Sequence, residues 1–211
     1  MQHSVLWSIK PKWTYEICTD TKKIEVRKTR PNLAVPFKNY IYCTKDRKFP
    51  LSLGPFGPSK LDFGDSEYDM QGKIVAEFIC PEVIEFTWDE YNCCYAISDD
   101  DLSLTCLTQE ELYEYGKGKT LYGIRIENLI TYDKPKPLWT MRHLCKEYGS
   151  ENPYCDDCPY FIDDRSYEYD ESDCGVSGLP PFIRPPQSWA YATPYKNDLK
   201  EYYPDAIKMD R

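Results

Sequence analysis

Residues 8–31 read SIKPKWTYEICTDTKKIEVRKTRP, and a change of hydrophobic period inside this stretch sets the fold class that the sequence predicts. Pro11 is tolerated in the first turn of a helix, and two large apolar side chains follow four residues apart, so residues 12–18 are predicted to be a short helix. Residues 22–30 instead alternate apolar and charged side chains, which is typical of a strand.

The rest of the chain repeats this mixture of short strands and short helices. Thr108 and Glu111 have the spacing of a capping box, which predicts a helix over residues 108–116. Residues 46–72 are rich in Pro and Gly and predict a long loop. Further strands are predicted over residues 4–9, 38–44, 73–86 (interrupted by Pro81) and 120–132 (ended by Pro135 and Pro137). This pattern predicts a β-rich α+β fold, a small barrel with two short helices.

A short motif in the first stretch resembles the ASCH domain family, a branch of the PUA-like superfamily. The family pattern G-x-K-x-x-E-x-R falls on Asp20, Lys22, Glu25 and Arg27, with Asp20 in the place of the glycine. The resemblance extends over residues 4–140 and implies a PUA-like β-barrel with a cleft beside the first helix that binds RNA or a modified nucleotide. The sequence RPPQSWAYA at residues 184–192 resembles the closing segment of prophage-type members.

One branch of the family removes an acyl group from acetylated cytidine with a Lys, a Thr and a Glu. The resemblance places Lys22 at the lysine, whereas Glu25 stands where the threonine would be, and Thr105 lies near the third position. Because two of the three roles are not matched, the hydrolase activity is not carried over to this chain.

Composition divides the chain into three predicted parts. Residues 1–140 are expected to form the ASCH-like barrel with the long loop 46–72, residues 141–180 a Cys-rich zinc-binding insertion, and residues 181–211 a segment that packs back on the barrel. The insertion is acidic and poor in apolar residues, so it needs a staple or the support of the barrel.

The charged side chains of the first stretch form the predicted binding site. Lys23, Glu25 and Arg27 share one strand face, and this row faces outward if Ile24 and Val26 face the core. Arg suits bidentate recognition of a phosphate or a base edge, and aromatic rings can stack on bases. The predicted nucleic-acid-binding residues are Lys10, Lys12, Lys22, Lys23, Glu25, Arg27 and Tyr42.

An enzyme is the first alternative. Lys22 and Glu25 are the candidate catalytic residues of a hydrolase, a nuclease or an amidohydrolase that acts on RNA or a modified nucleoside. A lysine whose pKa is lowered by burial and by other cations can act as a base.

Four cysteines of the insertion have the spacing C-x9-C-x2-C-x15-C, which predicts a tetrahedral thiolate site with no open position. Such a site favours structural zinc, while an iron–sulfur cluster uses the same type of ligand. The candidate ligands are Cys145, Cys155, Cys158 and Cys174, and His143 is an alternative first ligand.

The net charge of −9 is unevenly distributed and bears on the partners. Residues 1–60 hold 12 Lys and Arg against 4 acids, whereas residues 61–211 hold 14 against 31. An acidic protein should not coat nucleic acid indiscriminately, but a local basic surface can meet phosphate. The acidic runs at residues 99–101 and 156–173 leave a second alternative, a phage-type inhibitor that binds a protein with a basic surface.

The expected location is the cytoplasm. The chain has no run of ~18 apolar residues that could span a membrane. Its first residues become charged at once, without the apolar core of a signal peptide. The ten cysteines are therefore expected to be reduced, which favours metal binding over disulfides.

Overall fold

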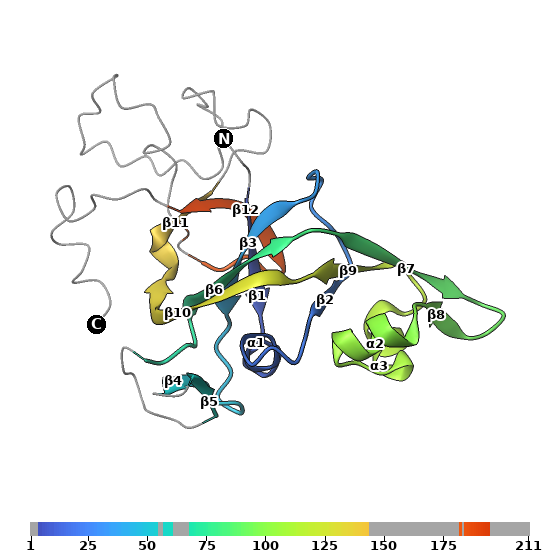
Figure 1. Cartoon of the computed structure of the whole chain (residues 1–211), viewed down its shortest axis with the longest axis horizontal. Coiled ribbons are helices and arrows are strands. Elements are labelled where there is room, and N and C mark those ends of the chain that lie inside the picture. The colour runs from blue at the N-terminus through green and yellow to red at the C-terminus, as the bar shows by residue number, and fades with distance from the viewer. Residues whose placement is uncertain (1–3, 55–56, 61–67, 144–181, 183, 195–211) are drawn as a thin grey trace, which may run out of the picture.

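A computed structural model describes residues 4–54, 57–60, 68–143, 182 and 184–194 of the 211 (Figure 1). The predicted metal ligands Cys145, Cys155, Cys158 and Cys174 lie outside the described residues, as does most of the predicted insertion. The elements are β1 (Ser4–Ile9), α1 (Pro11–Cys18), β2 (Ile24–Arg27), β3 (Phe37–Cys43), β4 (Ser52–Gly54), β5 (Gly57–Ser59), β6 (Lys73–Cys80), β7 (Val83–Asp89), β8 (Cys94–Ala96), α2 (Asp99–Thr105), α3 (Gln109–Gly116), β9 (Leu121–Arg125), β10 (Glu127–Pro137), the 3-10 helix η1 (Leu138–Thr140), β11 (Met141–His143) and β12 (Trp189–Pro194).

The larger sheet has six strands in the order β10-β6-β3-β1-β12-β11. Strand β1 lies in its interior, parallel to β3 and antiparallel to β12, and all six of its residues are buried. One face of this sheet packs against α1, around Val5, Trp7 and Ile17. Its other face carries a second apolar cluster that includes Leu6 and Tyr42.

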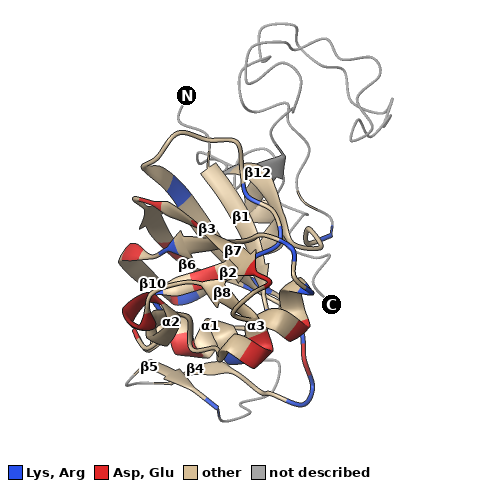
Figure 2. Ribbon diagram, turned by 90° about the vertical axis from the view of Figure 1, so that its right-hand side faces the viewer, with Lys and Arg blue, Asp and Glu red and all other residues tan. Residues whose placement is uncertain are grey.

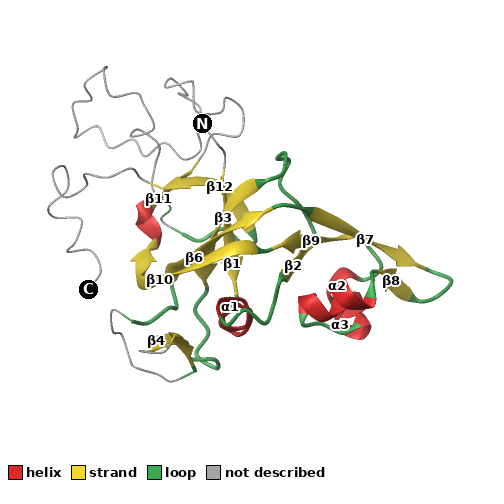
Figure 3. Ribbon diagram, viewed as in Figure 1, coloured by secondary structure: helices red, strands yellow, loops and turns green. Residues whose placement is uncertain are grey.

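The smaller sheet has four strands in the order β2-β9-β7-β8. Helices α2 and α3 lie together beside β2 and β8 (Figure 1), and all three α-helices lie along the same side of the sheets (Figure 3). The core of this part is built from Ile24, Val26, Phe86 and Leu112. Strand β2 therefore has one face that packs against the helices and β7.

The β-rich α+β fold class is confirmed, but the described strands form open sheets and not one closed barrel. The predicted strands 73–86 and 120–132 each divide in two, at Pro81 and at Ile126. Proline has no N–H to continue a ladder, so the chain leaves the larger sheet after β6 and enters the smaller one as β7. The chain returns to the larger sheet between β9 and β10. Residues 73–89 and residues 121–137 therefore each contribute one strand to each of the two sheets.

Local sequence signals account for the helices. Pro11 stands in the first turn of α1, and the predicted capping box of α3 is present, with Thr108 and Glu111 satisfying each other's backbone N–H groups. Helix α2 was not predicted, although Ser98 accepts a hydrogen bond from the Asp101 N–H and three aspartates favour the positive helix N-terminus. The acidic run 99–101 is thus the first turn of a helix.

Two other boundaries differ from the sequence prediction. The loop predicted over residues 46–72 contains the short hairpin of β4 and β5. Strand β10 continues through Pro135 to Pro137, because irregular pairing between Thr131 and Lys136 leaves the intervening residues out of the ladder with β6. Within the described residues, no helix combines the length and apolar character needed to cross a membrane.

Candidate functional site

The charged residues of β2 are buried, so the prediction that they form an outward row is wrong. Ile24 and Val26 pack into the core beneath the smaller sheet, as expected. Glu25 and Arg27 point to the opposite face, but each is only 7 % exposed. The second face of β2 is covered because the Ser8 carbonyl and the Ser188 side chain both accept hydrogen bonds from Arg27.

Three of the predicted residues form one buried cation–carboxylate–cation group, which we call the β2 triad: Lys22, Glu25 and Arg27. Glu25 Oε1 lies 3.1 Å from Arg27 Nη2, and Glu25 Oε2 lies 3.6 Å from Lys22 Nζ. The two cations share a single carboxylate in a region that water hardly reaches, so neither charge is screened as it would be on the surface.

Lys22 occupies the more deeply buried end of the β2 triad, where it is 2 % exposed. Its Nζ donates a hydrogen bond to the Thr105 carbonyl oxygen at 2.5 Å and lies 5.0 Å from the centre of the Trp13 ring. Burial lowers the pKa of Lys22, and the nearby Glu25 carboxylate and Cys106 thiol only partly oppose this effect. The ammonium is therefore easier to deprotonate than an ordinary lysine.

Arg27 occupies the other end, with its guanidinium over the Trp7 ring at 5.3 Å. Its Nη2 donates to the Ser8 carbonyl at 2.9 Å and its Nη1 donates to Ser188 Oγ at 3.3 Å. Within the described part of the chain, Nε is buried and has no hydrogen-bond partner. Leaving a buried donor unsatisfied costs about 1–3 kcal/mol, and more when it is charged, so this N–H is a donor that the fold itself leaves incomplete.

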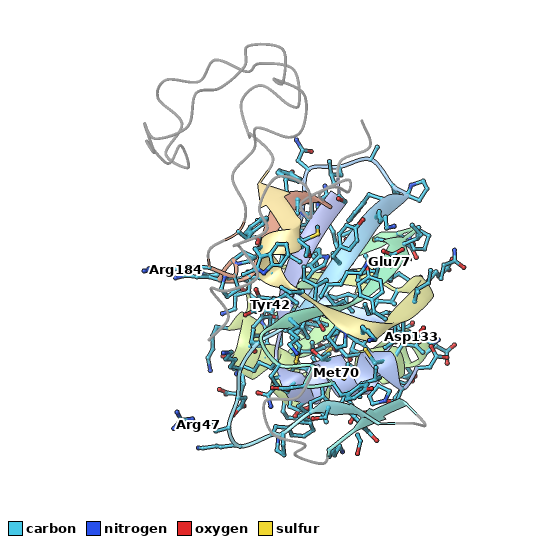
Figure 4. The ribbon with its side chains drawn as sticks, turned by 90° about the vertical axis from the view of Figure 1, so that its left-hand side faces the viewer. Tyr42, Arg47, Met70, Glu77, Asp133 and Arg184 are labelled. Atoms are coloured by element: carbon cyan, nitrogen blue, oxygen red, sulfur yellow. The ribbon has the colours of Figure 1, made fainter. Side chains whose placement is uncertain are left out.

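The remaining predicted residues lie in different surroundings. Lys10 is exposed, and Lys12 is exposed with its Nζ 4.2 Å from the centre of the Trp13 ring, close to the Lys22 end of the β2 triad. Lys23 is half-buried and forms an ion pair with Asp20. Tyr42 does not join them, because it packs with Leu6 on the other face of the larger sheet (Figure 4).

Four neighbours of the β2 triad were not predicted as binding residues: Ser8, Cys106, Tyr115 and Ser188. Ser188 reaches Arg27 from a position 161 residues away in the chain, which no local pattern could indicate. Tyr115 lies in α3, and both Arg27 and Glu25 influence the pKa of its phenol, which burial raises. The resemblance of residues 184–192 to a closing segment was the one signal near Ser188.

The acidic surface predicted for a protein partner can be followed only over the described residues, and the predicted metal ligands lie outside them. Among the described residues, no group of three or more His, Cys, Asp and Glu side chains could hold a metal ion. Residues 87–119 contain eight acids and two lysines, and the acids gather on α2 and α3 (Figure 2). Asp101 is held by Arg125 at 2.8 Å and is thus engaged within the fold. A protein partner with a basic surface stays a prediction.

An open cavity of about 880 Å³ lies elsewhere, between the end of α1, the β4–β5 hairpin and β10. Its wall includes Cys18, Tyr68 and Asp133, and among the described residues that line it there is no member of the β2 triad and no Lys or Arg. Burial raises the pKa of the Cys18 thiol to about 11, so this cysteine is not a reactive thiolate at neutral pH. The described wall of this cavity therefore brings no cation that could bind a phosphate.

No family model and no curated protein matches the sequence. The fold is similar to the crystal structure of an ASCH protein from Zymomonas mobilis, with 14 % identity, a TM-score of 0.42, and coverage of 64 % of this chain and 73 % of that one. It is likewise similar to two single-residue variants of that protein, at 13 % and 14 % identity, each with a TM-score of 0.42 over 64 % of this chain and over 76 % and 74 % of theirs. These structures carry the name of the family that residues 8–31 resemble.

Proposed function

We propose that this protein is a binding module that recognises a nucleotide of RNA, or a modified nucleotide, through the β2 triad. The observation that carries the proposal is the Arg27 guanidinium, which is buried, stacked on Trp7 and left with an unpartnered Nε. One acceptor atom of a nucleotide, on its base or its phosphate, would complete this donor set once the Ser188 side chain moves off Arg27, because Nε is buried in the structure. Arg is the side chain best suited to such planar recognition.

Burial of the β2 triad favours recognition of one nucleotide over a sequence-independent grip on a long strand. Non-specific binding draws its affinity from many exposed cations that neutralise successive phosphates. Here the net charge is −9, and two of the basic residues predicted to bind are held inside the fold. Exposed Lys12, whose ammonium lies over the same Trp13 ring as that of Lys22, can attract an anionic ligand toward the Lys22 end.

A titration of the intrinsic tryptophan fluorescence tests this proposal, because Trp7 and Trp13 both lie beside the β2 triad. The ligands are the four ribonucleoside 5′-monophosphates and a single-stranded RNA of mixed sequence. We expect Arg27→Lys, which keeps the charge and removes the planar fork, to weaken binding at least tenfold, or about 1.4 kcal/mol. Lys38→Met removes a cation from the other face of the larger sheet and should leave affinity unchanged. Equal losses in both variants, or no binding by the wild type at low salt, would overturn the proposal.

A hydrolase is the second candidate, and the lowered pKa of Lys22 beside Glu25 is the observation that favours it. In its neutral form the Lys22 amine could take a proton from a water whose oxygen adds to an N-acyl carbon. The same proton would then pass to the departing base amine, giving a free base and a carboxylic acid. Turnover of N4-acetylcytidine that Lys22→Arg and Glu25→Gln both abolish would establish this activity. Binding of N4-acetylcytidine without turnover would show that the protein is a binding module and not a hydrolase of this substrate.

We also propose a structural zinc ion held by Cys145, Cys155, Cys158 and Cys174. The support is the ligand spacing of the sequence, since these residues lie outside the described part of the chain. Elemental analysis of the purified protein should find about one zinc per chain, and Cys155→Ser should lower it. Iron and acid-labile sulfide in place of zinc would indicate the iron–sulfur alternative.

A further inference from the structure

Tyr115 and Lys28 lie together at the Arg27 end of the β2 triad. Tyr115 is 38 % exposed on α3, and Lys28 directly follows Arg27 and is exposed. Lys28 Nζ lies 4.7 Å from the centre of the Tyr115 ring. An aromatic face and a cation are therefore held beside the buried site.

The second exposed tyrosine of α3 shows what is unusual about Tyr115. Tyr113 is 42 % exposed, but its ring packs on Trp88 with 4.8 Å between the ring centres, so the fold itself uses that face. Among the described residues, the ring contact recorded for Tyr115 is the one with Lys28. The Lys28 ammonium lies over the Tyr115 ring, so a nucleobase that stacks on this ring takes the place of the ammonium and leaves it beside the nucleotide's phosphate.

Lys28 also differs from the cations near it, because those cations form ion pairs with acidic side chains. Lys23 pairs with Asp20, Arg30 with Glu85 and Lys117 with Glu114. Within the described ranges, Lys28 forms no ion pair. Its ammonium is thus available to a phosphate, the anionic group that every nucleotide linkage supplies.

We propose that Tyr115 and Lys28 form a second subsite, for the nucleotide adjacent to the one held by Arg27. The base of this neighbour stacks on Tyr115, and the phosphate between the two nucleotides meets Lys28. Glu110, Glu111 and Glu114 on α3 repel a phosphate chain, so the strand leaves on the Lys28 side of the ring. This inference rests on the proposed function of the β2 triad and assigns it a dinucleotide ligand.

The test compares a ribonucleoside 5′-monophosphate with the matching 5′-phosphorylated dinucleotide on the full chain. The wild type should bind the dinucleotide about tenfold more tightly, which is the size of one stacked base. Tyr115→Ala should abolish this gain, measured within each variant as the ratio of the affinities for the two ligands, and Tyr115→Phe should keep the gain. Tyr113→Ala, the matched control on the same helix, should also keep it.

Charge is tested separately with Lys28→Gln, against Lys119→Gln as an exposed lysine near the end of α3. Lys28→Gln should reduce the dinucleotide gain about threefold, and Lys119→Gln should not change it. The subsite is overturned if the wild type binds both ligands equally, or if Tyr115→Ala and Tyr113→Ala lose the same affinity. Absence of binding to either ligand would overturn the proposed function of the β2 triad as well, so the two failures are distinguishable.

Discussion

The β2 triad and a second ionic cluster use similar residues on different sheets, yet their environments have opposite effects. The second cluster, which we call the outer cluster, consists of Lys38, Glu77 and Tyr132 on β3, β6 and β10. Glu77 is labelled in Figure 4. Lys38 Nζ lies 2.8 Å from Glu77 Oε1, and the Tyr132 hydroxyl donates to Glu77 Oε2 at 2.6 Å.

The pKa values of the two lysines shift in opposite directions. For Lys38, burial alone would lower the pKa, but the hydrogen bond and charge of Glu77 outweigh it and raise the pKa. For Lys22, burial outweighs Glu25, and the pKa falls. The outer cluster satisfies its charges within the fold, whereas the β2 triad holds two cations on one carboxylate and an unpartnered Arg27 Nε. We therefore infer a ligand-binding site at the β2 triad, where a buried donor lacks a partner, and not at the outer cluster.

Removal of the shared carboxylate should separate the two clusters most strongly. Glu25→Gln leaves Lys22 and Arg27 buried without a counter-charge and should lower the free energy of unfolding by about 3–5 kcal/mol. Glu77→Gln, in a cluster whose lysine is partly exposed, should cost about 1 kcal/mol or less. Urea denaturation followed by circular dichroism measures both. Equal costs would show that burial does not distinguish the clusters.

Removal of the lysine should change stability in opposite directions. Lys22→Met keeps much of the apolar volume, removes a desolvated ammonium and leaves Glu25 paired with Arg27, so it should stabilise the protein at pH 7 by about 1–2 kcal/mol. Lys38→Met should cost about 0–1 kcal/mol, because it removes a favourable partly exposed pair. Urea denaturation measures the free energy of unfolding of both variants. A lower free energy of unfolding in Lys22→Met would contradict the account of the β2 triad.

Lys22 and Lys38 should also affect the pH dependence of stability in different ways. Since the pKa of Lys22 is lowered in the folded protein, the unfolded chain binds the extra proton, and stability should rise as the pH approaches the ordinary lysine value of 10.5. Lys38 has a raised pKa, so its contribution is complete below 10.5 and is lost only above it. The rise should therefore disappear in Lys22→Met and persist in Lys38→Met. Thermal denaturation across alkaline buffers measures it.

The salt dependence of RNA binding should give the smallest effect. If the buried β2 triad provides specificity and Lys28 alone meets a phosphate, the plot of log affinity against log salt should have a slope of about −1. The surface mode predicted from the sequence, with Lys10, Lys12, Lys23 and Arg27 on phosphates, would give a slope of about −3. The steeper value would support the surface mode of binding and count against the buried one.

The sequence predicted the elements that local patterns control. Helix α1 and the capping box of α3 follow from Pro11, Thr108 and Glu111, and the alternation of residues 22–30 correctly predicted a strand. It also put Glu25 and Arg27 on one strand face, but it gave that face Lys23 as its third member, whereas Lys23 pairs with Asp20 and Lys22 is the lysine that pairs with Glu25. The acids of α2 were interpreted as part of an acidic surface for a protein partner, whereas the structure places them in the first turn of a helix with a serine cap.

Burial of the site could not be predicted, because its cause is tertiary. Alternation assigns Glu25 and Arg27 to the face opposite Ile24 and Val26, and a lone sheet would expose that face. Ser8 comes from β1, and Ser188 comes from a segment 161 residues from Arg27. The sequence therefore identified the charged residues and gave the wrong environment for them.

The Arg27 Nε–H group itself provides the most direct test of the central claim. In ¹⁵N-labelled protein its side-chain signal can be assigned by its absence from the Arg27→Lys spectrum. Titration with the tightest-binding ribonucleoside monophosphate should shift this signal saturably and slow its exchange with water, as expected when the N–H gains an acceptor. If other signals report binding while the Arg27 Nε signal stays unchanged, the nucleotide binds elsewhere and the β2 triad is a structural ion pair.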